Sequence, residues 1–271
     1  MGRWTLDDIP WDRFDRSRAD PDVVAIVKAA SLVEYNGAAY ARHLCRVFHD
    51  DRDFQRTALR WGDEEIQHGR ALARWAALAD PSYDFAAAFD RFRAGYRVDF
   101  DSALSRRGSR SGEIIARCMI EVGTSSYYSA LRDGVQEPVL KEICRNIAAD
   151  EIRHYKLFYK TLGRCLERDR IGLVQRLKIA FGRIAEAQDD ELAYAYYAAN
   201  ETAGAYDRRR YSRAYAWRAL AWYREPHVRR MVALVFKTVG VSPHGRLARV
   251  ATRLVWRALC RGASGLERAA A

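Results

Sequence analysis

Apolar residues recur at helical spacing along almost the whole chain, and no two alternating segments are joined by a hairpin turn. The first helical run begins at Asp20-Pro21, where an N-capping aspartate precedes a proline in the first helical position. This run ends near residues 49–51, and a second run follows it directly. Another pair of helical runs is separated by a turn over residues 133–138. The pattern predicts an all-α protein.

These runs divide the chain into an arm, a bundle and an extension. Residues 20–80 and 112–168 would form two helical hairpins. They would be joined by a crossover over residues 80–112, which contains a short helical pattern from 82 to 97. Residues 1–19 precede the bundle as an N-terminal arm, and residues 169–271 follow it. We therefore predict a four-helix bundle over residues 20–168 with a long crossover and additional C-terminal helices.

Six side chains repeat one arrangement, a Glu followed about thirty residues later by a Glu-x-x-His pair. The interval between the two glutamates is 31 residues in the first copy and 30 in the second. A Glu and a His three residues apart lie on one face of a helix. In each predicted hairpin both glutamates lie about 20 Å from the turn, so they should lie opposite each other. The six residues are Glu34, Glu65 and His68 in the first hairpin, and Glu121, Glu151 and His154 in the second.

The helix faces that carry these glutamates are otherwise apolar or small. A carboxylate on such a face is costly unless it is paired or bound to a metal. Four antiparallel helices that contribute Glu, Glu-x-x-His, Glu and Glu-x-x-His inward form the ligand set of a di-iron or di-manganese centre. We expect two iron ions, with manganese as the alternative. Glu65 and Glu151 would bridge the metals, and Glu34 and Glu121 would be terminal or chelating ligands.

The motifs resemble those of a known family. Residues 140–154 are similar to the second iron motif of the soluble acyl-carrier-protein desaturases, and residues 64–69 to their first. Thr124 matches a threonine that this family places on the oxygen-binding side of the iron pair. The resemblance covers roughly residues 20–168. It implies a ferritin-like bundle, a di-iron cofactor and an O₂-dependent reaction, with Thr124 as a candidate proton relay.

Other members of the ferritin-like di-iron carboxylate superfamily are also similar. The 56 residues from Glu65 to Glu121 match the spacing of aldehyde-deformylating oxygenases and of arylamine oxygenases. The extra histidine of the arylamine enzymes is replaced here by Ile147. Ribonucleotide reductase small subunits usually open with Asp and carry a tyrosine four residues later, whereas this chain has Glu34 and Ala38. The Cys-x-x-Cys domain of rubrerythrins is absent from the sequence.

Residues next to the ligands suggest supporting roles. Asp150 and Glu64 each immediately precede a ligand Glu. A ligating histidine usually donates its other ring N–H to a carboxylate, so Asp150 is expected to hold His68 and Glu64 to hold His154. Thr124 could alternatively bond back to the carbonyl of Ile120. Several small residues could leave space for an acyl chain or could serve close helix packing; they are Gly37, Ala38, Ala41, Gly69, Gly123 and Ser125.

The net positive charge of the chain is confined to the C-terminal third. Residues 1–169 contain 27 basic and 27 acidic residues, whereas residues 170–271 contain 19 and 8. This segment alternates arginines with aromatic residues, and its last helix, over residues 243–261, carries a row of arginines. That row is predicted to lie opposite Leu247, Val250, Leu254 and Leu259. The candidate partner-binding residues are Arg208, Arg209, Arg210 and Arg213.

Three interpretations of this charge stay open. It is a solvated face of an arginine-rich chain, it docks an acidic partner such as acyl carrier protein, or it binds an anionic membrane surface. Nucleic acid is disfavoured because no recognition motif accompanies the charge. No signal peptide or membrane-spanning run is evident. Five cysteines without paired spacing indicate reduced thiols and a cytoplasmic location, with Cys118 and Cys144 expected in the core.

The predicted activity is that of a di-iron, O₂-dependent oxidoreductase, desaturase- or oxygenase-like, acting on a fatty acyl or other apolar substrate. The alternative is a ferroxidase or a rubrerythrin-like protein that handles iron or peroxide. A ferroxidase needs an acidic entry path for iron, which the basic C-terminal third does not favour. A helical scaffold without turnover is a third alternative, and a homodimer is left open.

Overall fold

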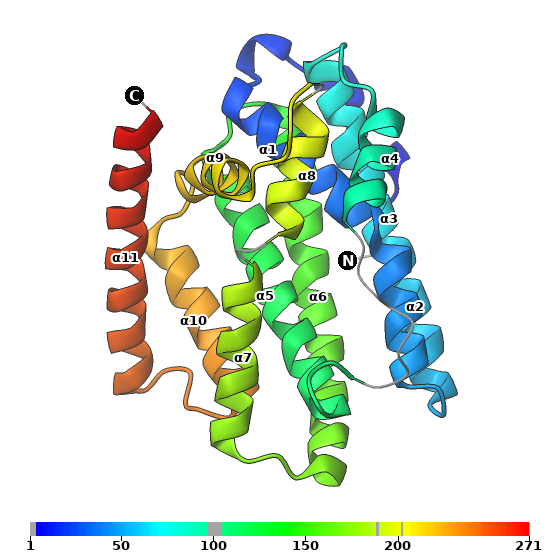
Figure 1. Ribbon diagram of the computed structural model, residues 1–271, viewed down its shortest axis with the longest axis vertical. Helices are drawn as coiled ribbons and strands as arrows, with labels where there is room; N and C mark the ends of the chain where they lie inside the picture. Colours follow the sequence, from blue (N-terminus) through cyan, green and yellow to red (C-terminus); the bar gives the residue numbers. More distant parts are fainter. Residues whose placement is uncertain (1–3, 97–104, 188–189, 202, 271) are drawn as a thin grey trace. The chain divides into compact units, whose positions relative to one another are not determined.

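The computed structural model describes residues 4–96, 105–187, 190–201 and 203–270, and all regular secondary structure in these ranges is helical (Figure 1). The prediction of an all-α protein is confirmed. Residues 97–104 of the predicted crossover lie outside the described residues. Among the described helices, none is both long enough and apolar enough to span a membrane.

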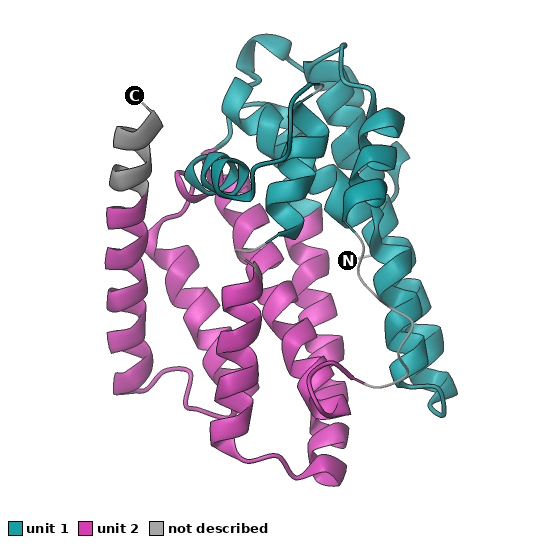
Figure 2. Cartoon of the chain, viewed as in Figure 1, with its two compact units in different colours: residues 1–104, 135–146, 188–218 teal, residues 105–134, 147–187, 219–271 magenta. Residues whose placement is uncertain are grey.

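The chain forms two compact units that interleave along the sequence (Figure 2). Unit 1 comprises residues 1–104, 135–146 and 188–218, and unit 2 comprises residues 105–134, 147–187 and 219–271. This division differs from the predicted order of arm, bundle and extension. Each unit combines one ligand-bearing part of the predicted bundle with part of the C-terminal third.

Unit 1 is built around α3. Helix α3 packs against α1 and α2, and α8 packs against α1 and α4. Three short 3-10 helices precede α1 in the N-terminal arm: Leu6–Asp8, Trp11–Arg13 and Arg16–Arg18. The longer helices are α1 (Pro21–Tyr35), α2 (Gly37–Val47), α3 (Arg52–Ala79), α4 (Phe85–Gly95), α8 (Glu191–Asn200) and α9 (Arg208–Leu220), the last of which continues two residues beyond the unit.

The helix starts in unit 1 follow the capping signals. The Asp20 carboxylate accepts hydrogen bonds from the backbone N–H groups of Asp22 and Val23, and Asp51 accepts one from Phe54. The single helix predicted to reach residues 49–51 is wrong, because it breaks at Asn36. Asparagine competes with the helical backbone for hydrogen bonds, and the glycine that follows has low helix propensity. Glu34 therefore lies in the last turn of α1.

Unit 2 is built around α5 and α10. Helix α5 packs against α7 and α10, and α10 also packs against α7 and α11. The start of α5 is tied to the end of α6 because the Ser111 N–H donates to the Asp169 carboxylate at 2.7 Å. Its helices are α5 (Arg110–Gly134), most of α6 (Pro138–Asp169), α7 (Leu173–Ala187), α10 (Glu225–Val239) and α11 (Arg246–Ala270). Helix α6 contributes residues 138–146 to unit 1.

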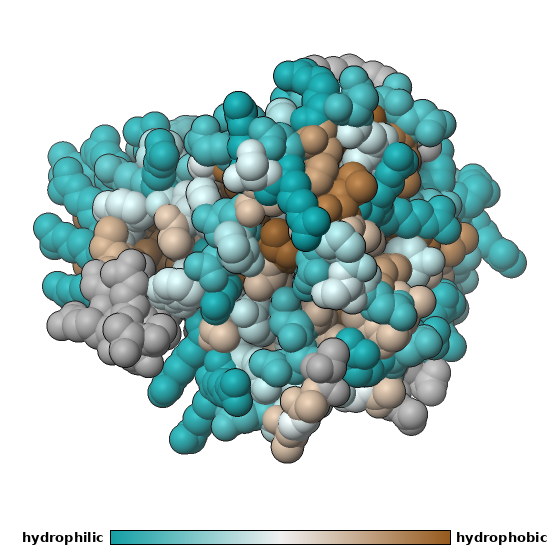
Figure 3. Space-filling view, turned by 90° about the horizontal axis from the view of Figure 1, so that it is seen from above, coloured by the Kyte–Doolittle hydropathy of each residue, from teal (hydrophilic) through white to brown (hydrophobic). Residues whose placement is uncertain are grey.

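The apolar residues of α11 do not form the single face that we predicted. Leu259 packs onto a buried cluster of Val228, Val232 and Ala248. In contrast, the side chains of Leu247, Val250 and Leu254 are 70%, 51% and 60% exposed. The helix packs on α10 through a different stripe, so these three side chains point outward beside the arginine row. Elsewhere apolar side chains are exposed in small areas of a mostly hydrophilic face (Figure 3).

Candidate metal centre

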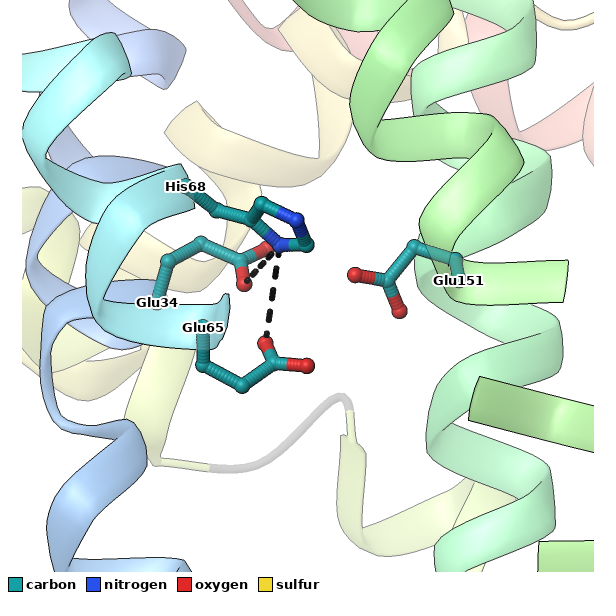
Figure 4. Close-up of side chains that lie close together, drawn as sticks. All are labelled: Glu34, Glu65, His68 and Glu151. Atoms are coloured by element: carbon teal, nitrogen blue, oxygen red, sulfur yellow. Dashed lines mark ion pairs between the residues drawn. The ribbon is translucent and has the colours of Figure 1, made fainter. Parts of the chain in front are cut away.

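In unit 1 the structure brings together three of the predicted ligands (Figure 4). Glu34 comes from the last turn of α1, and Glu65 and His68 come from one face of α3. Nδ1 of His68 lies 3.7 Å from Oε2 of Glu34 and 3.9 Å from Oε2 of Glu65. All three side chains are buried, and each offers a ligand atom within 4.8 Å of the others. This triplet could hold a metal ion.

Glycine contacts set the distance between α3 and the helices that face it. A Cβ on Gly37 would overlap the Cβ of Glu65 and lie 3.0 Å from the carbonyl oxygen of Gly62. A Cβ on Gly69 would lie 2.5 Å from the backbone nitrogen of Tyr35. At Gly37 and Gly69 the small residues therefore serve close helix packing and leave no room for an acyl chain.

A tryptophan from the N-terminal arm covers His68. The Trp4 and His68 rings are stacked, with centroids 6.0 Å apart and planes 2° apart. The Gln67 side-chain amide donates to the Trp4 carbonyl oxygen at 2.9 Å and holds the arm on α3. Trp4 was not among the predicted site residues. Its signal was an aromatic residue in an otherwise polar arm.

In unit 2 the structure brings together the other three ligands. Glu121 comes from α5, and Glu151 and His154 come from α6. Nδ1 of His154 lies 3.6 Å from Oε2 of Glu121 and 3.9 Å from Oε1 of Glu151. Each of the three residues is at most 2% exposed, and the three ligand atoms lie within 4.8 Å of one another. The second triplet therefore repeats the first in residue types, distances and burial, and it too could hold a metal ion.

The surroundings of the second triplet are apolar, as predicted. The buried neighbours on α5 and α6 include Ile114, Cys118, Ile147 and Phe158, and Cys144 is also in the core. Burial, followed by the charge of Glu151, raises the pKa of Glu121 to about 7, and a hydrogen bond with His154 acts in the opposite direction. Arg117 contributes a positive charge, with Nη1 3.7 Å from Oε1 of Glu121.

Thr124 makes both of the contacts considered in the sequence analysis. Its hydroxyl lies 3.2 Å from the Ile120 carbonyl oxygen and also donates to Oε2 of Glu151. Thr124, which lies one turn after Glu121 on α5, is therefore hydrogen-bonded to the carboxylate of Glu151, another predicted ligand. A Cβ on the neighbouring Gly123 would meet no atom within 4 Å, so space for another group exists at this position.

The predicted supporting carboxylates are on the expected helices. Asp150 is buried on α6 and forms an ion pair with Arg153. Glu64 is half-buried on α3. The proposed contacts of Asp150 with His68 and of Glu64 with His154 stay predictions, because each pair joins residues of different units.

Unit 1 contains a further carboxylate that the sequence analysis missed. Glu191 is the first residue of α8, and its Oε1 is shielded from solvent without a hydrogen-bond partner among the described residues. Burial, followed by the charge of Glu34, raises the pKa of Glu191 to about 8. The sequence carries little signal for it, since a single Glu at the start of a helix is common.

Three of the four predicted partner-binding arginines line one surface hollow. Its volume is about 760 Å³, and its lining residues are Tyr206, Asp207, Arg208, Arg209, Ser212 and Arg213. Arg210 instead lies 3.9 Å from Glu201 and over the ring of Tyr211. Around the hollow the aromatic residues form a tyrosine cluster: Tyr194, Tyr197, Tyr206 and Tyr211.

No family model matches this chain, and a search of curated proteins finds no similar sequence. Buried, closely spaced Glu and His side chains on apolar helix faces match the donor set of a metal centre.

Proposed function

We propose that the two triplets together form a dinuclear iron centre in a ferritin-like helical bundle, and that the protein is an O₂-dependent oxidoreductase. The observation that carries the proposal is the equivalence of the triplets. Each has two glutamates and one histidine, with Nδ1 to carboxylate distances of 3.7 and 3.9 Å in one and 3.6 and 3.9 Å in the other. Four carboxylates and two imidazoles are the donor set of di-iron and di-manganese bundle proteins.

The buried carboxylates of the site have negative charge that the surrounding protein does not fully compensate, which supports a bound cation. In the absence of metal, the Glu121 carboxylate is buried close to Glu151 and its pKa is raised to about 7. A cation between such groups would remove both the repulsion and much of the desolvation cost. Glutamate and imidazole ligands suit iron and manganese, and the redox chemistry of O₂ favours iron.

When bound, iron would supply the electrons and open coordination positions needed to activate O₂. The protein would orient His68 and His154 and keep water from the site through its apolar neighbours. The Thr124 hydroxyl holds one oxygen of Glu151 and is placed to pass a proton at that oxygen. Trp4 would shield the ring face of His68.

The substrate is proposed to be a fatty acyl or other apolar molecule. The apolar side chains around Glu121 and Glu151 support this class. The arginine-lined hollow of α9 supports delivery by an acidic partner such as acyl carrier protein. In this proposal α9 is the docking element.

Metal analysis and an oxygen-consumption assay test the proposal. Protein expressed in iron-replete medium should contain about two iron ions per chain. Reduced protein supplied with acyl carrier protein loaded with a fatty acyl group should consume O₂ and modify the acyl chain. Fewer than one transition metal per chain would contradict the metal centre. Iron oxidation without any change in the acyl substrates offered would instead favour the ferroxidase alternative.

A further inference from the structure

Helix α11 has an inward side that is packed and an outward side that is exposed. The inward side packs on α10 through an apolar cluster that includes Ala248, Val255 and Leu259. Within unit 2 the helix lies at the outer edge, beside α10 (Figure 2). The inward contacts therefore hold α11 in place and leave its outward side available to a partner.

The outward side carries an apolar strip. Leu247, Val250 and Leu254 follow one another at i, i+3 and i+7, and each of them is more than half exposed. At 1.5 Å rise per residue the strip runs for about 10 Å along the helix axis. Single exposed aliphatic residues are common on folded proteins, whereas contiguous ones mark interaction surfaces.

A row of arginines lies beside this strip. Arg246, Arg249 and Arg253 are exposed, and each immediately precedes one member of the strip. Successive residues of a helix are about 100° apart around its axis, so the row and the strip are neighbours on the outward side. The chain from residue 226 to residue 266 contains eight basic residues and no acidic residue. The outward side of α11 therefore combines aliphatic side chains with dense positive charge.

This combination limits the class of partner. A second copy of the chain would bring the same arginines to the interface, and the like charges would repel each other. A protein partner would need a groove shaped to fit the ridge of a single helix. A bilayer surface needs no groove, because aliphatic side chains enter the boundary between headgroups and acyl chains while arginines contact anionic headgroups.

We propose that the outward side of α11 binds the surface of an anionic lipid bilayer, with the helix axis parallel to that surface. The inference goes beyond the proposed oxidoreductase activity and does not depend on the metal centre. It leaves α9 as the docking element for an acidic partner, because the arginines of α9 and α11 are separate sets on different helices.

The helix is already formed before it meets the bilayer. Its packing on α10 fixes the outward side, so binding does not have to order an unstructured segment. The helix content measured by circular dichroism should therefore stay unchanged when vesicles are added. A segment that folds only on the membrane would instead gain helix.

Co-sedimentation of the full chain with lipid vesicles tests the proposal. The wild type should bind vesicles of phosphatidylglycerol and phosphatidylcholine, and should bind vesicles of phosphatidylcholine alone at least about tenfold more weakly. Leu247→Gln combined with Leu254→Gln should weaken binding to the anionic vesicles by at least about tenfold, because less apolar surface enters the bilayer. Changing Arg246, Arg249 and Arg253 to Gln should have an effect of similar size, because the attraction to the headgroups is lost.

A matched control uses two exposed leucines of α3. Leu59 and Leu78 are 49% and 39% exposed, and changing both to Gln should leave vesicle binding unchanged. All of these positions are exposed, so the variants should unfold at the same temperature as the wild type and contain the same amount of metal.

A fluorescent label locates the contact. An environment-sensitive dye on Val250→Cys, in a chain with Cys45→Ser and Cys260→Ser, should shift its emission to shorter wavelength when anionic vesicles are added. The same dye on Leu59→Cys should show no shift.

Equal vesicle binding by the wild type and by the Leu247→Gln, Leu254→Gln variant would overturn the assignment to α11. Wild-type protein that does not bind the anionic vesicles would overturn the lipid partner. If the α11 arginine variant then bound acyl carrier protein more weakly than the wild type, this side of the helix would belong to an acidic protein. Each of these failures would leave the metal content, and with it the proposed function, unaffected.

Discussion

The indole of Trp4 lies parallel to the imidazole of His68, with ring centroids 6.0 Å apart and planes 2° apart. Trp4 is 64 residues before His68, and the hydrogen bond from Gln67 to its carbonyl oxygen keeps it in place. The N-terminal arm is therefore part of the candidate metal centre. It covers the ring that would orient one metal ion.

Replacing Trp4 by alanine should weaken metal binding at the unit 1 triplet. Water would gain access to the His68 ring, and the ring would lose a contact that restricts its orientation, so the affinity should fall by about tenfold. Transfer of Co²⁺ to a coloured chelator measures this. Trp11→Ala is the control, because Trp11 lies in the same arm but stacks with Arg74 and bonds to Leu6. Equal effects of the two changes would contradict a specific role for Trp4.

Glu65→Ala should remove both metal ions, because we predict that this carboxylate bridges them. Glu34→Ala should weaken one ion more than the other, since Glu34 is predicted to bind only one. Metal content per chain after gel filtration distinguishes these outcomes. Asp63→Ala, on an exposed position of the same helix, should retain two ions. Full metal content in Glu65→Ala would show that the bridging assignment is wrong.

The metal-free protein should lose stability as the pH rises from about 5 to about 8. Folding raises the pKa of Glu121 from an ordinary 4.5 to about 7 and that of Glu191 to about 8, mainly because both carboxyls are buried. The folded state therefore holds more protons than the unfolded state in this window. The contribution to stability is complete below the unfolded pKa values and is lost as the pH passes the folded ones.

Urea unfolding at several pH values measures this dependence. Glu121→Gln and Glu191→Gln should each reduce the slope, because the amide does not titrate. Bound metal should reduce or reverse the slope, since the cation replaces the protons as the compensating charge. A metal-free protein whose stability rises steadily between pH 5 and pH 8 would contradict the assigned protonation of these carboxyls.

Glu137 should stabilise the fold of unit 1 and should not contribute to metal binding. Glu137→Ala leaves the Trp75 and Leu140 N–H donors without their buried acceptor and should cost about 3 kcal/mol of unfolding free energy. Trp75→Phe removes one donor and should cost about 1–2 kcal/mol. Glu142→Ala breaks only a partly exposed pair with Arg145 and should change stability by less than about 1 kcal/mol. Denaturant unfolding checks all three.

Charge reversal at the α9 hollow should slow docking of an acidic partner. Changing Arg208, Arg209 and Arg213 to Glu should lower the association rate with acyl carrier protein by about tenfold or more and leave metal content unchanged. The wild-type rate should fall as salt is added, because exposed charges are screened over about 8–10 Å at physiological ionic strength. Stopped-flow or surface binding measurements provide the rates.

A matched triple change on α11, of Arg246, Arg249 and Arg253 to Glu, alters the net charge equally at another exposed surface. It should have a smaller effect if α9 is the docking element. A larger effect in the α11 variant, together with loss of binding to anionic vesicles, would favour a membrane surface reached through the exposed Leu247, Val250 and Leu254.

Local periodicity alone was sufficient to predict much of this protein. The all-α class follows from helical periodicity, and the helix starts at Asp20 and Asp51 follow from their capping residues. Both Glu/Glu/His triplets follow from spacing. A Glu and a His three residues apart share a helix face, and glutamates at equal distances from the turn of a hairpin lie opposite each other. The break at Asn36 was not predicted, although its cause, an asparagine followed by a glycine, is local. Close packing at Gly69 was one of two alternatives, and only the approach of α3 to Tyr35 decides between them.

Only the tertiary structure decided which distant residues lie near the predicted ligands. Glu191 lies 157 residues after Glu34, and nothing in its local pattern separates it from a solvent-exposed helix start. The contact of Trp4 with His68, and the outward orientation of Leu247 and Leu254 in α11, could not be predicted for the same reason. The periodicity of each helix can be predicted from its own residues. Which face of a helix packs against a neighbouring helix, and in which register the two helices pack, depends on the fit of side chains from segments far apart in the chain.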